Sequence, residues 1–173
     1  MILQKIILLN ILISIFFSLN TFSQEINQPL KMGESRDWEA YRTDVGDKRT
    51  CFATSIPKSS KGDYKERGTV RIYVTHGPAQ NITNEVSVKA GYNYKQQSIV
   101  KFNVDGKNFN MFTYEDGAWA ETPELEAKIV SAMKAGNKLL VSGTSSRGTD
   151  TEDTYSLFGF TAALKLIDKA CGR

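Results

Sequence analysis

The chain of 173 residues carries 22 basic and 19 acidic residues, and a net charge of only +3 favours no particular charged partner. Its most basic stretch ends at Arg67 but also contains Asp63 and Glu66, which is typical of a solvated loop and argues against a nucleic-acid-binding surface. The length fits one domain with a hydrophobic core and is too short for two.

The first 23 residues have the order of a secretory signal peptide. Lys5 precedes an apolar stretch over residues 6–19, and small side chains stand at Thr21 and Ser23, where cleavage requires them. A retained membrane anchor is the alternative, but polar residues interrupt the stretch. No cysteine stands at the junction, so we expect no lipoprotein anchor. Cleavage after Ser23 predicts a periplasmic protein, and attachment at the periphery of the outer membrane or secretion are the alternatives.

The chain after the signal peptide begins with a polar stretch and continues with strands. Residues 24–36 show no period of two or of 3.6, so we expect a flexible leader before a domain over residues 37–173. Alternating apolar and polar residues predict strands at 51–55, 69–75, 85–89, 138–144 and 151–157. A charged, glycine-containing loop is expected between Pro57 and Gly68.

The clearest hairpin lies at residues 98–112. Val100, Phe102 and Val104 alternate with polar residues up to Asp105-Gly106, after which the alternation resumes. Asp and Gly tolerate the positive φ angles that a type I′ turn requires at both central residues. We therefore expect two antiparallel strands joined at this dipeptide.

Two helices are predicted among the strands. Thr122 suits the N-cap and Pro123 the first helical position of the first helix, which ends at Gly136. The second helix covers about residues 160–170, where Phe160 and Cys171 fall on the same apolar face.

Two cysteines in an exported chain predict one disulfide, between Cys51 and Cys171, which fixes the last helix to an early strand. A redox or metal-binding role for these thiols is the alternative, but the chain has no C-x-x-C motif and a single histidine. About seven or eight strands with two short helices indicate a mainly β fold, a β-sandwich or jelly-roll-like domain.

In these features the sequence resembles the invasion-associated locus B family of exported bacterial proteins. The segments that carry the resemblance include CFATS at 51–55, DGAW at 116–119, GTSSRGT at 143–149, DTYSLFGFTAAL at 153–164 and KAC at 169–171. The resemblance implies a β-sandwich-type domain in a Gram-negative envelope. It also implies a family named for host-cell invasion that has no agreed molecular activity, so no site residue is transferred.

The residues themselves supply no catalytic constellation. His76 is the only histidine and stands at a strand end without the partners of a hydrolytic triad, so we interpret it as a turn or surface residue. The pairs Glu115-Asp116 and Glu152-Asp153 are adjacent in sequence, so their side chains point apart, and we interpret both as solvated turns. We predict no catalytic residue, cofactor or metal site.

Aromatic residues offer a candidate ligand surface at Tyr92, Tyr94 and Trp119, since flat rings bury large areas at low entropic cost. Two hypotheses follow. The first is a non-enzymatic envelope module that binds an unidentified envelope or host-surface macromolecule, with no nucleic acid and no transmembrane segment after cleavage. The second is a protein that binds a small glycan or peptide, or a carbohydrate-active hydrolase.

Overall fold

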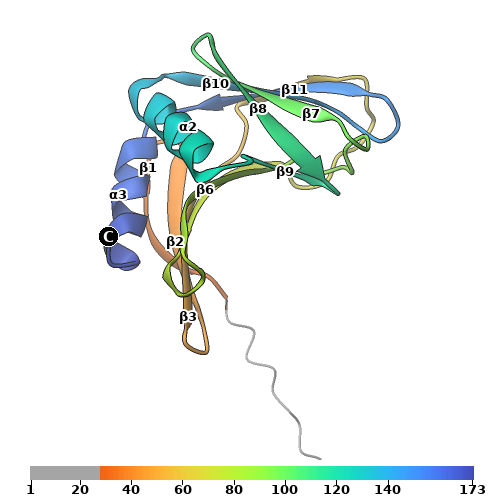
Figure 1. The fold of residues 1–173 in the computed structure, drawn as a ribbon. Coiled ribbons are helices and arrows are strands. Elements are labelled where there is room, and N and C mark those ends of the chain that lie inside the picture. Colours follow the sequence, from red (N-terminus) through yellow and green to blue (C-terminus); the bar gives the residue numbers. More distant parts are fainter. Residues whose placement is uncertain (1–27) are drawn as a thin grey trace, which may run out of the picture.

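A computed structural model describes residues 28–173 (Figure 1). The predicted signal peptide and its cleavage point after Ser23 lie outside the described residues. The described part forms a single antiparallel sheet of 11 strands with two α-helices and one short 3-10 helix. Within it, neither helix has the length and apolar character needed to cross a membrane. The predicted mainly β fold with two short helices is confirmed.

The strands follow one another in the sheet in the order β1-β2-β3-β5-β6-β9-β8-β7-β10-β11-β4. Their bounds are β1 Leu30–Ser35, β2 Trp38–Val45, β3 Lys48–Ser55, β4 Ser59–Gly62, β5 Arg71–Gly77, β6 Ile82–Lys89, β7 Ile99–Val104, β8 Lys107–Tyr114, β9 Gly117–Trp119, β10 Lys138–Thr144 and β11 Asp150–Ser156. The helices are the 3-10 helix η1 Pro78–Gln80, α2 Pro123–Ala135 and α3 Phe160–Ala170.

The sheet is bent on itself, which gives the sandwich-like shape. In Figure 1, β7, β8, β10 and β11 form an upper layer. Strands β1, β2 and β3 lie below this layer and run roughly across the direction of its strands. Strands β5 and β6 continue from one part into the other, so a single sheet supplies both layers. The largest fully buried side chains of the resulting core are Trp38, Tyr155, Phe102, Phe160, Ile72 and Met111.

Four strands, β1, β2, β4 and β9, lie where none was predicted. Strand β1 occupies part of the predicted flexible leader over residues 24–36, and pairs with β2 from Leu30 to Ser35. Strand β4 lies in the predicted charged loop and pairs with β11. Strands β1 and β4 are the two edge strands, and their residues are exposed or half-buried, so pairing with one neighbour holds them without an alternating apolar pattern. The sheet therefore includes Leu30–Ser35, which lie before the predicted start of the domain at residue 37.

The local signals for α2 and for the β7–β8 hairpin are confirmed. The Thr122 hydroxyl accepts a hydrogen bond from the Leu125 amide at 3.2 Å, which caps the first turn of α2. Asp105 and Gly106 have φ angles of 45° and 93°, as the tight turn requires. The Asp105 carboxylate also accepts hydrogen bonds from the Asn137 and Lys138 amides at 2.7 and 3.2 Å. This turn residue therefore also positions the start of β10.

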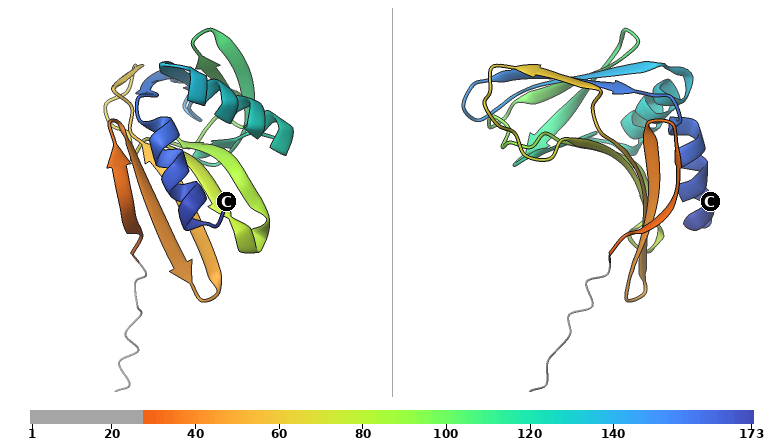
Figure 2. Two further views of the ribbon diagram at one scale, coloured as in Figure 1. Left: turned by 90° about the vertical axis from the view of Figure 1, so that its left-hand side faces the viewer. Right: turned by 180° about the vertical axis from the view of Figure 1, so that it is seen from behind.

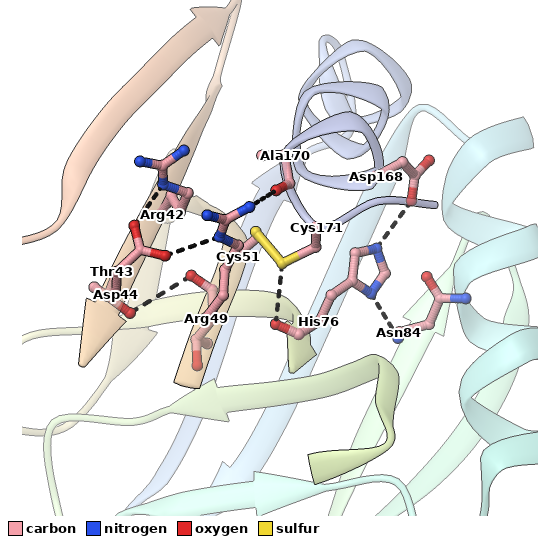
Figure 3. The surroundings of a disulfide bond; sticks show 11 residues. Arg42, Thr43, Asp44, Arg49, Cys51, His76, Asn84, Asp168, Ala170 and Cys171 are labelled. Atoms are coloured by element: carbon pink, nitrogen blue, oxygen red, sulfur yellow. Dashed lines mark hydrogen bonds and ion pairs between the residues drawn. A yellow bond between two sulfur atoms is a disulfide. The ribbon is translucent and has the colours of Figure 1, made fainter. Parts of the chain in front are cut away.

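Helix α3 packs across β1, β2 and β3 on the core side of the sheet (Figure 2). The Trp38 and Phe160 rings lie 4.8 Å apart between centroids, which joins β2 to the beginning of the helix. At its other end, Cys171 forms the predicted disulfide with Cys51 of β3, with 6.1 Å between the Cα atoms (Figure 3). The C-terminal helix is thus held at both ends.

Candidate functional site

A buried ion pair lies where three loops meet. The Arg67 guanidinium donates two hydrogen bonds of 2.8 Å to the two carboxylate oxygens of Asp153 on β11. The two side chains are only 5% and 3% exposed. Arg67 also donates to the carbonyl of Ala90, with the shorter bond at 2.7 Å. Burial alone would lower the pKa of Arg67, but its hydrogen bonds and the charge of Asp153 raise it, so the guanidinium keeps its charge.

Aromatic rings enclose this pair. The Arg67 guanidinium carbon lies 5.1 Å from the Tyr64 ring centroid and 5.0 Å from that of Tyr92, both within cation–π distance. The Tyr92 hydroxyl forms a 2.5 Å hydrogen bond with the Thr151 hydroxyl. Tyr94 packs edge-on against Tyr92, with 5.2 Å between centroids. The position of Arg67 is therefore fixed on all sides.

Two glycines bring the loops together. The Gly68 amide donates to the Gly91 carbonyl at 2.8 Å. A Cβ atom at Gly91 would lie 2.5 Å from the Gly68 carbonyl oxygen, and the φ of Gly91 is 73°. Any other residue at Gly91 would therefore separate the two segments. This close approach places the loop before β5 against the loop after β6.

The third loop joins β10 to β11 and is tied to both sides. The Ser145 hydroxyl accepts from the Thr149 amide at 3.1 Å, and the Ser146 amide donates to the Asn93 carbonyl at 2.7 Å. These bonds leave the side chains of Ser146 and Arg147 exposed.

Between the three loops lies a cleft of about 890 Å³, lined by residues 63–68 and 91–93 and by Ser145, Ser146, Arg147, Thr149 and Thr151. Acidic and basic residues line it in equal number: Asp63, Glu66, Lys65 and Arg147, besides Arg67, whose charge Asp153 neutralises. Hydroxyls and ring edges make up much of the rest. Such a lining suits recognition of a polar, nearly neutral group through hydrogen bonds and stacking.

The predicted ligand surface is divided by the structure. Tyr92 lines the cleft, and Tyr94, 6% exposed, packs behind it in the core. Trp119 lies elsewhere, on the solvent face of β9, because its neighbour Ala118 is buried and strand residues alternate. Tyr92 and Tyr94 therefore belong together, and Trp119 belongs to a different surface.

The interpretation of Arg67 and Asp153 as solvated residues is wrong. Asp153 follows the same face of β11 as the buried Thr151 and Tyr155, which is the signal in the sequence that places it inside. Its neighbour Glu152 points outward and pairs with Lys61 at 3.3 Å. The adjacent carboxylates thus face apart, as expected, but only one of them is solvated. No local signal identifies Arg67 as its partner, because the pair joins residues 86 positions apart.

The interpretation of His76 as a turn or surface residue is also wrong. Its side chain is fully buried beside the disulfide (Figure 3). The Nδ1 atom accepts a hydrogen bond from the Asn84 amide at 3.1 Å, so the neutral ring carries its proton on Nε2 and donates it to Asp168 of α3 at 2.9 Å. No solvent-accessible atom remains for catalysis, and the residue connects β5 to α3.

The buried histidine predicts a dependence of stability on pH. Burial lowers the pKa of His76 below 6.5, outweighing the opposite effect of Asp168. Because the unfolded chain binds the proton more readily, the stabilising contribution is complete above about pH 6.5 and is lost as the pH falls. We expect the free energy of unfolding in urea to fall more between about pH 7.5 and about pH 5.5 in the native protein than in His76→Gln.

This comparison removes the titration of other groups. Burial raises the pKa of Glu126 to about 7, an effect that stabilises the fold as the pH falls and is present in both proteins. An equal or smaller fall in the native protein than in His76→Gln would contradict the assignment.

Among residues 28–173, no group of three or more His, Cys, Asp or Glu side chains is arranged to hold a metal ion. The fold and the site define the class of protein: a mainly β domain that is cross-linked by one disulfide and has a polar cleft between its loops. Residues 38–168 match the model of the Invasion associated locus B (IalB) protein family, and the chain belongs to this family. No curated protein and no solved structure shows a significant match to it.

Proposed function

We propose that the protein is an exported envelope protein that acts as a non-enzymatic binding module, with the cleft between segments 63–68, 91–93 and 145–151 as its binding site. Membership of the family and the disulfide support an envelope location, since disulfides form and persist in oxidising compartments. The periplasm is the compartment that we propose, after removal of residues 1–23.

The observation that carries the proposal is the rigid construction of the cleft. A buried ion pair, a close glycine contact and hydrogen bonds from the β10–β11 loop hold its walls before any ligand arrives. Preorganised walls reduce the entropy lost on binding, which favours recognition of a partner. The exposed Arg147 and Ser146 stand at the rim, where they are free to contact it.

A hydrolytic role has less support from the same residues. Asp153 is engaged by Arg67, and Glu152 is directed to the outer face, so these two carboxylates do not face each other across the cleft. Within the second hypothesis we therefore prefer binding of a small polar ligand, for which the cleft volume is also suitable.

Site-specific photo-crosslinking tests the binding site in the living envelope. We expect a photoreactive phenylalanine derivative placed at Arg147 to give one reproducible covalent adduct of higher mass in cells that produce the protein at its natural level. The matched control carries the same group at Lys165, which is exposed on α3, away from the cleft.

Adducts that are identical from both positions, or absent from Arg147 under several growth conditions, would contradict the proposal. Fractionation of the same cells tests the compartment separately, because protein found in the cytosol in reduced form would contradict export whatever the crosslinks show.

A further inference from the structure

A row of aromatic side chains runs across the solvent face of the sheet. Strand register places Tyr73 and Trp119 on either side of Ser87, Trp119 opposite Phe112, and Phe112 opposite Ile99. The row is therefore perpendicular to the strands and crosses β5, β6, β9, β8 and β7. It continues diagonally, since the Phe52 ring lies 6.0 Å from Tyr73 and 5.3 Å from Tyr41. We call these five aromatic residues, with Ile99, the aromatic row.

The part of this row on β7, β8 and β9 is exposed. Phe112 is 48% and Ile99 57% exposed, and the neighbouring Tyr114 is 67% exposed. The Phe112 and Trp119 rings are nearly parallel, at 29°, with 5.9 Å between centroids. The indole occupies the space above Gly117, where a Cβ atom would come within 2.2 Å of it. Gly117 therefore allows the large ring to lie over its own strand.

The row lies in the interior of the sheet and on its free side. Helix α3 covers the opposite face of β2 and β3 (Figure 2). Trp38 and Cys51 point to that face, since they contact Phe160 and Cys171. Strands β5, β6, β9, β8 and β7 each pair with a strand on both sides, so their backbone hydrogen-bonding groups are already engaged. A ligand there is recognised by side chains, and an added β-strand is excluded.

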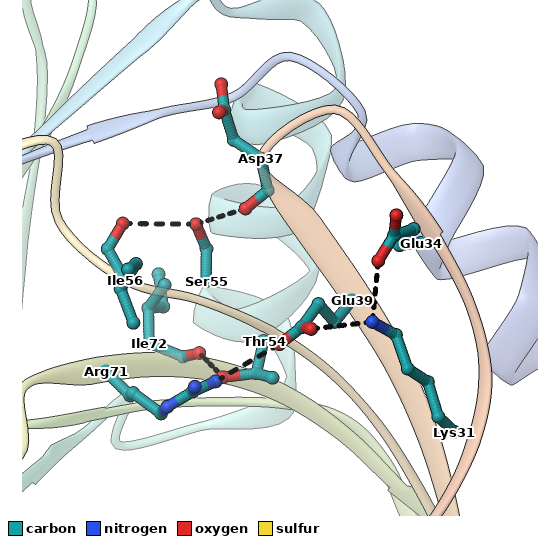
Figure 4. A network of polar contacts seen from close by, with 9 residues as sticks. All are labelled: Lys31, Glu34, Asp37, Glu39, Thr54, Ser55, Ile56, Arg71 and Ile72. Atoms are coloured by element: carbon teal, nitrogen blue, oxygen red, sulfur yellow. Dashed lines mark hydrogen bonds and ion pairs between the residues drawn. The ribbon is translucent and has the colours of Figure 1, made fainter.

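The charges beside the row neutralise one another. Arg71 forms an ion pair with Glu39 at 3.6 Å. Glu39 also forms an ion pair with Lys31 at 2.9 Å (Figure 4). At the other end Lys89 pairs with Asp116 at 3.1 Å. Lys101 on β7 adds one cation and Glu85 on β6 adds one carboxyl group. One cation is far fewer than the basic clusters by which proteins bind anionic membranes.

Amide side chains continue the same face of β8. Asn108 and Asn110 are exposed and alternate with residues that point to the core, so they stand in line with Phe112 and Tyr114. Amides donate and accept hydrogen bonds without adding charge. Flat rings beside neutral amides are complementary to sugar rings, which present C–H faces and a rim of hydroxyls.

From these observations we infer that the aromatic row binds an uncharged polysaccharide laid across strands β7, β8 and β9. The sugar faces stack on Phe112, Tyr114 and Trp119, and the hydroxyls bind the amides of Asn108 and Asn110. The length of the row, which spans several strands at about 4.8 Å each, fits a chain of sugars better than a single one. This site is separate from the cleft and does not depend on the proposed function.

Affinity electrophoresis of the purified protein tests the inference, with laminarin, mannan or dextran as probes in native gels. We expect at least one polysaccharide to slow the protein and to shield Trp119 from a fluorescence quencher. Since Trp38 is buried, the quenchable emission comes from Trp119. Phe112→Ala should raise the dissociation constant about tenfold or more, whereas Lys165→Ala on α3 should leave it unchanged.

Because Phe112 and Tyr114 point away from the core, their alanine variants keep it intact, which thermal unfolding verifies. Retardation by none of the three polysaccharides, or equal retardation of native protein, Phe112→Ala and Tyr114→Ala, would overturn the inference. Self-association of the protein, or its binding to uncharged phosphatidylcholine vesicles, would also overturn the inference if Phe112→Ala abolished it. The aromatic row would then bind a second copy of the chain or a lipid surface. A crosslinked partner at Arg147 would not change any of these results.

Discussion

Replacing both Cys51 and Cys171 with alanine is expected to lower the free energy of unfolding by about 5 kcal/mol. The disulfide joins residues 120 positions apart, so it removes much of the conformational entropy of the unfolded chain. Alanine is the suitable replacement because Cys51 is fully buried, and a serine hydroxyl there would lack a defined partner. Urea unfolding, followed by the fluorescence of the buried Trp38, measures the loss.

Reduction supplies the control for this variant. Dithiothreitol should destabilise the native protein by a similar amount and leave the double alanine variant unaffected. A loss below about 1 kcal/mol in both experiments would show that the bridge contributes little, as happens where the reduced chain keeps residual structure.

Replacing Arg67 with methionine is expected to cost about 3–5 kcal/mol, because the buried Asp153 carboxylate loses its counter-charge. The Ala90 carbonyl also loses the guanidinium that donates to it. The double variant Arg67→Met with Asp153→Leu should recover a large part of this loss, since no unpaired charge then remains buried. Urea unfolding of the two single variants and the double variant measures the coupling.

Lys61→Met serves as the matched control, since its ion pair with Glu152 lies on the outer face, with side chains 74% and 39% exposed. Exposed pairs contribute about 1 kcal/mol or less, so this variant should be nearly as stable as the native protein. If Arg67→Met were no less stable than Lys61→Met, the ion pair would not be the element that holds the cleft.

The elements whose signals lie within a few residues were predictable. The N-cap at Thr122, the Asp105-Gly106 turn and the apolar face of α3 all appear where the sequence places them. Each depends on contacts within one turn or one hairpin, which neighbouring residues specify.

The edge strands and the site were not predictable in this way. Strand β1 lacks an alternating pattern and is held by pairing with β2 and by packing against α3. His76 resembled a turn residue until α3 supplied Asp168 as its partner. Trp119 was predicted to share a surface with Tyr92. The alternation of side chains along β9 instead places it on the opposite, solvent-facing side of the sheet.

The sequence by itself determined the class of fold, the disulfide, the two helices and most of the strands, because periodicity, capping and cysteine pairing are local or have a single solution. The tertiary structure alone decided the burial of Arg67 with Asp153, the cleft that they support and the aromatic row across the strands. These features join residues far apart in the chain, and such contacts depend on the strand order and register of the folded sheet.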